Sequence, residues 1–239
     1  MLAANRLCER CGKRACCVDM YGAALCQGCL KRSVVGRVLR WIRMASPHPR
    51  ENILLVGRGD AQSLAALELV TSVEKGYDAS IRVIEVGARP ALQGRCTTLN
   101  LDYEFYKADY ETYTGFRLSA LPYISGYKDA LVVLPDTVED LAAYALGEVF
   151  LGDRRGTKLD SQYRVAYPLG AVSFRELFQL FPSVAREGRT LFERSRAREV
   201  VEWALLSSPT LCNATVRALL ELNKVLNGSK IFKPALRQV

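Results

Sequence analysis

Four cysteines near the start of the chain have the spacing of metal ligands. Cys8 and Cys11 form one Cys-x2-Cys pair, and Cys26 and Cys29 form a second pair after fourteen intervening residues. Two such pairs can direct four thiolates onto one tetrahedral zinc ion, and four protein ligands leave no open position for catalysis. An iron–sulfur cluster or a redox pair is the alternative interpretation of this spacing. We expect a structural zinc site at Cys8, Cys11, Cys26 and Cys29.

A glycine-containing turn further along the chain has the position of a phosphate-binding loop. It follows the apolar run 53–56, which indicates a buried strand, and precedes a helical pattern over 63–70. Its residues are Arg58, Gly59, Asp60, Gln62 and, at the start of the helix, Ser63. Nucleotide-binding α/β proteins hold phosphate at such a place with backbone N–H groups. Asp60 would cap the helix but repel a phosphate, so we expect a turn that keeps its structural role and binds no nucleotide.

A basic helix is expected directly after the second cysteine pair. Apolar residues recur at helical spacing over 31–44 and form one face of this helix. Five basic residues lie around the rest of it: Lys31, Arg32, Arg37, Arg40 and Arg43. They can contact RNA phosphates, or they can belong to an ordinary solvated surface helix. Both interpretations stay open, with these five residues as the candidate RNA contacts.

The charge of the chain is distributed unevenly. Residues 1–50 hold ten Lys/Arg and two Asp/Glu, residues 51–150 hold eight and fifteen, and residues 151–239 hold fifteen and eight. Basic ends around an acidic middle suggest a polyanionic partner held by the ends; solvated surface charge is the alternative. No apolar run has the length of a membrane span, and the first residues lack the pattern of a signal peptide. We therefore expect a cytoplasmic protein with no membrane partner, whose cysteines serve metal binding or structure.

The elements that must position these groups alternate along the sequence. Strands are expected at 53–56, 80–86, 104–108 and 130–135, with a helix at about 138–151. This alternation predicts a parallel sheet, in which ligands bind where the carboxyl ends of strands meet the amino ends of helices. A second segment, 136–140, lies at that edge. Helical patterns over 191–206 and 214–226 predict a helical C-terminal tail.

This succession of a four-cysteine module, a basic helix and a strand–turn–helix unit resembles the PP-loop tRNA-thiolating enzymes. That family binds the pyrophosphate of ATP with Ser-Gly-Gly-x-Asp-Ser, and the matching segment here is Arg58-Gly59-Asp60-Ala61-Gln62-Ser63, which keeps only Gly59 and Ser63. Its second motif, His-Asn-Leu-Asp-Asp, matches Asp136-Thr137-Val138-Glu139-Asp140 and keeps only the acidic pair. Its Cys-x2-Cys-Gly segment, which holds an iron–sulfur cluster or catalytic thiols, matches Glu111-Thr112-Tyr113-Thr114-Gly115, without a cysteine.

These combined losses resemble the non-catalytic subunits of cytoplasmic tRNA wobble-uridine thiolases, the tRNA 2-thiolation protein 2 family, which also carries a Phe-Pro-Ser segment like 181–183. The resemblance implies a pseudo-enzyme without catalytic residues or ATP. Its partners would be tRNA and a catalytic PP-loop subunit that receives sulfur from a carrier. A Cys-x2-Cys pair expected late in the longer relatives is missing around Cys212, and Cys96 and Cys212 are expected to pack in the interior. The alternatives are an active ATP-dependent tRNA sulfurtransferase with an atypical loop, and a zinc-ribbon nucleic-acid adaptor unrelated to thiolation.

The resemblance also divides the chain into four parts. We expect a zinc-ribbon module at 1–30 and a basic linker helix at 31–50. A degenerate PP-loop domain, Rossmann-like and similar to the adenine nucleotide alpha hydrolases, would occupy 51–170, and a helical C-terminal region would occupy 171–239. Cys16 and Cys17 would be bystanders inside the first part.

Overall fold

Five parallel strands form the central sheet of the protein, in the order β5-β4-β3-β6-β7. The computed structural model describes residues 6–45, 50–74, 78–182, 199–201, 203–204 and 209–227. The strands are β3 (Asn52–Gly57), β4 (Ser80–Gly87), β5 (Asp102–Lys107), β6 (Leu131–Val133) and β7 (Arg164–Ala166). In register, Ile53 of β3 lies opposite Ile81 of β4 and Leu131 of β6. The predicted α/β class with a parallel sheet is confirmed.

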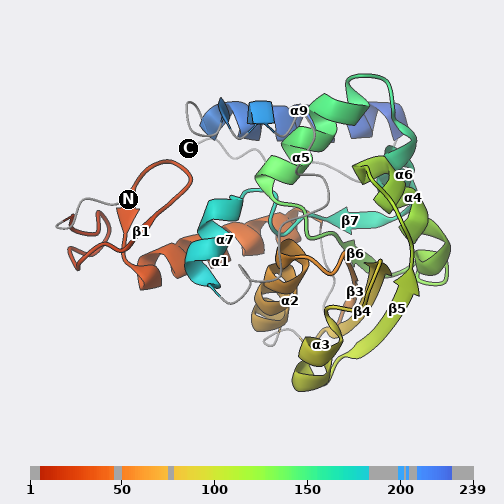
Figure 1. Cartoon of the computed structure of the whole chain (residues 1–239), viewed down its shortest axis with the longest axis horizontal. Helices are drawn as coiled ribbons and strands as arrows, with labels where there is room; N and C mark the ends of the chain where they lie inside the picture. The colour runs from red at the N-terminus through yellow and green to blue at the C-terminus, as the bar shows by residue number, and fades with distance from the viewer. Residues whose placement is uncertain are drawn as a thin grey trace.

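Helices cover both faces of this sheet (Figure 1). One face is covered by α1 (Gln27–Met44), α2 (Ala61–Glu74), α3 (Gln93–Leu99) and α7 (Phe174–Leu180). The other is covered by α4 (Tyr113–Ile124), α5 (Val138–Tyr144), α6 (Lys158–Gln162) and α9 (Pro209–Asn227). Because side chains alternate between faces along a strand, β3 sends Leu54 and Val56 into one core and Ile53 and Leu55 into the other. The turns at the carboxyl ends of the strands are therefore supported by a core on each side.

The N-terminal module projects from one end of the molecule (Figure 1). It contains a two-stranded antiparallel sheet of β1 (Cys17–Val18) and β2 (Ala24–Leu25). Helix α1 begins at Gln27, earlier than predicted, so the expected boundary between residues 30 and 31 falls inside one helix. Val34, Val38 and Ile42 of α1 are fully buried against the sheet domain. One continuous helix thus connects the module to the core; the other predicted boundaries stay predictions.

Several elements differ from those expected. The third strand runs over Asp102–Lys107 and the fourth is limited to Leu131–Val133. The predicted helix at 138–151 is α5 followed by a π-helix, Ala145–Val149. Helices α3, α4 and α6 and strand β7 were not predicted. The helical pattern over 214–226 lies within α9, whereas most of 191–206 is outside the described residues. None of the helices among the described residues combines the length and the hydrophobicity needed to cross a membrane.

Candidate functional site

The turn between β3 and α2 uses its own hydrogen-bond donors internally. The hydroxyl of Ser63 accepts from the backbone N–H of Arg58 at 2.8 Å, and Asp60 Oδ1 accepts from the Ser63 N–H at 2.8 Å and from its hydroxyl at 2.6 Å. The predicted capping role of Asp60 is thereby confirmed. Gly59 has φ +74, and a Cβ there would come within 2.3 Å of Glu85 Oε1, so this glycine is required by the fold itself. The backbone N–H groups of Arg58 and Ser63 are thus occupied by acceptors within the turn.

Arg58 fills the space beside this turn with a buried positive charge. Its guanidinium donates from Nε to Asp60 Oδ2 at 2.8 Å and from Nη1 to Asp136, and Nη2 lies 3.7 Å from Asp140 Oδ2. Its side chain is 3% exposed, and those of Asp136 and Asp140 are fully buried. Burial by itself lowers the pKa of Arg58, but the carboxylates outweigh this effect and raise it well above its ordinary value. Arg58 therefore stays charged and holds the two edge segments together.

The side chains of the second predicted segment, 136–140, also form hydrogen bonds within the protein. The Thr137 side chain accepts from the N–H of Asp140, and Asp140 Oδ2 accepts from the N–H of Thr137, which forms a capping box at the start of α5. Gln62 Nε2 donates to Asp140 Oδ2 at 3.3 Å, so the two segments meet as predicted from the parallel topology. Glu139 Oε1 accepts from the N–H of Phe174 at 2.8 Å. The retained acidic pair caps one helix and supports another.

A second buried arginine belongs to this cluster and was missed from the sequence. Arg117 of α4 is 1% exposed; it donates from Nη2 to Asp136 at 3.3 Å and from Nη1 to Asp160 at 2.8 Å and the Tyr167 hydroxyl at 3.0 Å. Its guanidinium carbon lies 4.4 Å from the ring centroid of Tyr144. A single arginine in an otherwise apolar stretch was the available signal, because a charge buried in a helix requires a partner. Asp136 is thus held between two guanidinium groups.

The four predicted metal ligands come together. The sulfur atoms of Cys8, Cys11, Cys26 and Cys29 all lie within 4.8 Å of one another, and those of Cys11 and Cys26 are 3.6 Å apart. One ion with Zn–S bonds of about 2.3 Å in tetrahedral geometry places thiolates about 3.8 Å apart, which this arrangement fits. A four-iron cluster interposes its own atoms and requires a wider separation of the thiolates. The donor set fits a single metal ion.

The local environment favours the thiolate form at two of these ligands. Burial raises the pKa of the Cys8 thiol, but backbone hydrogen bonds from Cys26, Arg10 and Cys11 outweigh it and lower this pKa to about 6. Backbone hydrogen bonding also lowers the pKa of Cys26. Burial raises the pKa of Cys17 to about 12, which keeps it a neutral thiol outside the metal cluster. Cys96 and Cys212 are buried in the two cores, as expected.

The five candidate RNA contacts divide into two groups. Lys31, Arg32, Arg40 and Arg43 are exposed on α1. Arg37 instead donates to Glu176 at 2.6 Å and to the backbone oxygen of Ala171 at 2.7 Å, and its side chain is 14% exposed. Because Glu176 is fully buried, this ion pair connects α1 with α7. Arg37 thus has a packing role that the helical pattern did not reveal.

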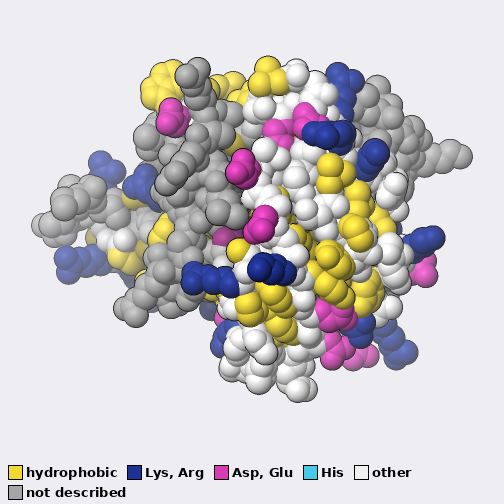
Figure 2. Space-filling model, turned by 45° about the vertical axis from the view of Figure 1, so that its right-hand side comes forward, with side chains coloured by type: hydrophobic (Ala, Val, Ile, Leu, Met, Phe, Trp, Pro, Cys, Tyr) yellow, Lys and Arg dark blue, Asp and Glu magenta, His cyan; other side chains and the backbone are white. Residues whose placement is uncertain are grey.

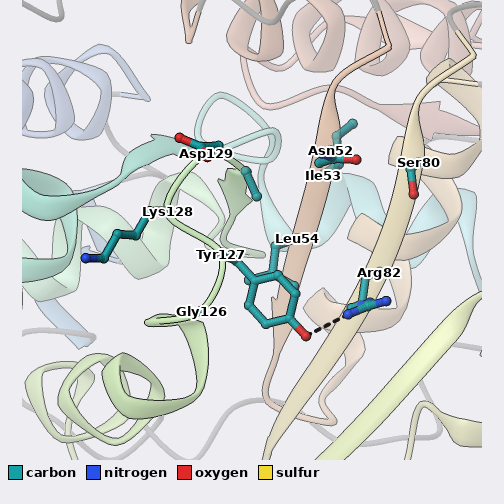
Figure 3. A pocket seen from close by; sticks show the side chains of 10 residues that line it. Asn52, Ile53, Leu54, Ser80, Arg82, Gly126, Tyr127, Lys128 and Asp129 are labelled. Carbon is teal, nitrogen blue, oxygen red and sulfur yellow. Dashed lines mark hydrogen bonds between the residues drawn. The ribbon is translucent and has the colours of Figure 1, made fainter.

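A pocket of about 320 Å³ lies at the opposite edge of the sheet, at the amino ends of β3 and β4 and the turn before β6. Tyr127 lies inside it, and its hydroxyl accepts from Arg82 Nη1 at 2.8 Å (Figure 3). Arg82 is already paired with Asp102 at 3.1 Å. Ligands of open parallel sheets bind at the other edge, where the strands end. This pocket is therefore separate from the turn between β3 and α2.

Comparison with solved structures relates the fold to one thiolase. The U34-tRNA thiolase NcsA from Methanococcus maripaludis, solved with its [4Fe-4S] cluster, matches with a TM-score of 0.74 and 14% identity, over 94% of this chain and 88% of that one. The chain has the fold of this thiolase. An NH3-dependent NAD synthetase from Campylobacter jejuni matches more weakly, with a TM-score of 0.46 and 15% identity over 90% of this chain and 100% of that chain. No protein-family model and no curated protein sequence matches this chain.

Proposed function

We propose that the chain is a non-catalytic subunit of a tRNA wobble-uridine 2-thiolation complex. The likeness of its fold to a U34-tRNA thiolase supports the link to tRNA thiolation. The observation that carries the non-catalytic part is the buried cluster of Arg58 with Asp60, Asp136 and Asp140. In this cluster the side chains of Arg58, Asp60 and Ser63 are already engaged with partners inside the protein.

Electrostatics argue against an active ATP site at this edge. A nucleotide phosphate approaching the turn would meet Asp60, which already accepts from the Ser63 N–H. Releasing Arg58 to bind it would leave fully buried Asp136 with one fewer cation. Breaking a buried ion pair in this way costs about 3–5 kcal/mol. Mg-ATP titrated into the protein by calorimetry is expected to give no saturable heat, and saturable micromolar binding would favour an active sulfurtransferase instead.

Zinc is the metal we propose for the four-cysteine site. The close spacing of the four sulfur atoms suits one tetrahedral ion. The [4Fe-4S] cluster named for the thiolase from Methanococcus maripaludis makes iron the competing assignment. Elemental analysis of protein purified under anaerobic conditions separates them: we expect one zinc per chain and no visible absorption band from an iron–sulfur cluster. Stoichiometric iron would overturn this assignment.

The deciding experiment for the function is genetic. In a strain that lacks this chain, mass spectrometry of digested tRNA is expected to show loss of 2-thiouridine at the wobble position. Reintroduced wild-type protein should restore it and should copurify with a catalytic PP-loop subunit and tRNA. Unchanged thiouridine would instead favour a zinc-ribbon adaptor unrelated to thiolation.

A further inference from the structure

The described part of the N-terminal module and α1 carries a large excess of positive charge. Residues 6–45 contain nine Lys/Arg and two acidic residues. Both carboxylates accept hydrogen bonds from backbone N–H groups. Glu9 accepts from the N–H of Ala24 at 2.8 Å, and Asp19 accepts from those of Tyr21 and Ala23. Apart from Arg37, the basic residues form no ion pair within the described chain; they are Arg6, Arg10, Lys13, Arg14, Lys31, Arg32, Arg40 and Arg43. We call these eight residues the basic surface.

The metal ligands lie between the two halves of the basic surface. The first cysteine pair holds the loop that carries Arg10 and Lys13, because the Cys8 N–H donates to the Lys13 oxygen at 2.6 Å. The second pair is at the start of α1, where the Cys29 N–H donates to the Cys26 oxygen at 3.0 Å. One ion bound by both pairs therefore fixes the loop against the helix. Lys and Arg side chains are visible on this projecting end in Figure 2.

One direct contact joins the same two halves: Arg10 Nη2 donates to Ser33 Oγ of α1 at 3.3 Å. Within α1, Arg32 Nη2 donates to the sulfur of Cys29 at 3.2 Å. These contacts are exposed or half-buried and are too weak to hold like charges together without the metal. Each strand of the small sheet beside them has two residues. A structural zinc ion supplies much of the folding free energy of a module of this kind, and this free energy offsets the mutual repulsion.

We propose that the metal site and the basic surface form one nucleic-acid-binding unit, in which the bound ion holds Arg10, Lys13 and Arg14 beside Lys31 and Arg32. The ligand class is the phosphate backbone of RNA, and binding requires the metal. This inference rests on the proposed function, because it assigns the tRNA contact to a defined surface. It extends that function by making metal occupancy a condition for RNA binding, although the metal touches no RNA.

The first experiment changes the metal and leaves the basic residues in place. Labelled tRNA is titrated with full-length protein at low salt and followed by fluorescence anisotropy. The Cys11→Ser variant loses a metal ligand on the exposed side of the cluster, and Cys16→Ser is the matched control, since Cys16 is an exposed cysteine outside it. We expect Cys11→Ser to lose the metal and at least about tenfold in affinity, consistent with lost phosphate contacts. Cys16→Ser should keep both.

A second pair of variants keeps the proposal falsifiable if Cys11→Ser misfolds. Lys13→Glu with Arg14→Glu reverses two charges of the basic surface, whereas Lys107→Glu with Lys128→Glu makes the same change in net charge at exposed positions elsewhere. Both proteins should retain the metal. The first should lower the slope of log affinity against log salt by about 0.7–0.9 per lost contact, and the second should leave it unchanged.

The outcomes separate this inference from the function on which it rests. If Cys11→Ser binds tRNA like the wild type after losing its metal, or if both double variants behave alike, the inference is overturned and the proposed function stands. If the wild-type protein does not bind tRNA at low salt, both fail. Wild-type protein that loses tRNA on chelation and regains it with added Zn²⁺ supports the inference.

Discussion

Replacing Arg58 with alanine tests whether the turn between β3 and α2 is held by a buried ion cluster. The substitution removes the cation that faces three carboxylates, those of Asp60, Asp136 and Asp140. Each carboxylate keeps some partners: Asp136 keeps Arg117 at 3.3 Å, and Asp60 keeps the Ser63 N–H. The carboxylates become partly uncompensated in a site that water does not reach.

The expected cost follows from that geometry. Removing one partner of a buried ion pair costs about 3–5 kcal/mol, and the remaining hydrogen bonds place Arg58→Ala near 3 kcal/mol. For a chain of this size, 1 kcal/mol shifts the midpoint of thermal unfolding by about 2–4 °C, so the expected decrease is roughly 6–12 °C. The loss should be greatest near pH 7. It should diminish in acid, because protonation of the orphaned carboxyls in the folded variant relieves their repulsion.

Calorimetry and circular dichroism of the full chain measure this decrease. Arg154→Ala is the matched control, because Arg154 is exposed and makes no ion pair within the described residues, and its change should stay within about 0.5 kcal/mol. Combining Arg58→Ala with Asp60→Asn should cost less than the sum of the two single changes, since asparagine also caps a helix. A decrease below about 1 kcal/mol for Arg58→Ala would refute the reasoning that this guanidinium is required by the buried carboxylates.

Three further changes test other parts of the molecule. Arg37→Ala should cost about 2 kcal/mol in thermal unfolding with unchanged tRNA affinity, because it removes the cation paired with the buried Glu176. Arg40→Ala should do the reverse, and equal effects on binding would contradict the assignment. Glu74→Gln should raise the unfolding midpoint at pH 7, because burial first and Glu51 second raise the pKa of Glu74. Its folded pKa exceeds its unfolded pKa, so wild-type stability falls as the pH rises across that window, and the gain should vanish near pH 4. Chelation of the purified chain should lower the unfolding midpoint, and zinc should restore it; an unchanged midpoint would exclude a structural ion.

The positions of the longer sheet strands could be predicted because buried parallel strands appear as continuous apolar runs. This holds for β3 and β4, whose expected positions differ from the observed bounds by one residue at each end or less. Strand β7 has three residues, too few to give such a signal. Helix α4 was hidden because its segment was aligned with a cysteine motif, although Thr112 caps it by accepting from the Gly115 N–H.

The four-cysteine site could be predicted from the sequence, whereas the buried ion pairs of Arg58 could not, for a physical reason. The short spacing within each Cys-x2-Cys pair already predicts that its two sulfur atoms can bind one ion. The structure brings all four sulfur atoms together. Asp60 was expected to cap a helix from its local position, and it does. The partners of Arg58 include Asp136 and Asp140, far along the chain, so its burial depends on the packing of two crossover units. Sequence spacing alone cannot give such a long-range pairing.

A series of contacts connects Arg58 to the N-terminal module. Arg58 holds the segment 136–140, whose Glu139 accepts from the N–H of Phe174 at the start of α7. Helix α7 in turn supports the N-terminal module, because Glu176 accepts from the N–H of Met20 and Gln179 from that of Val18.

A purely apolar filling of the loop could have been as stable, but it would not provide the capped helix starts from which this series of contacts runs. The charged groups around the turn between β3 and α2 therefore help to place the metal module on the sheet domain. This accounts for the polar residues of the turn, and it predicts that Arg58→Ala weakens tRNA binding only at temperatures where the sheet domain begins to unfold. Loss of tRNA affinity by the fully folded variant would instead make Arg58 part of the RNA surface.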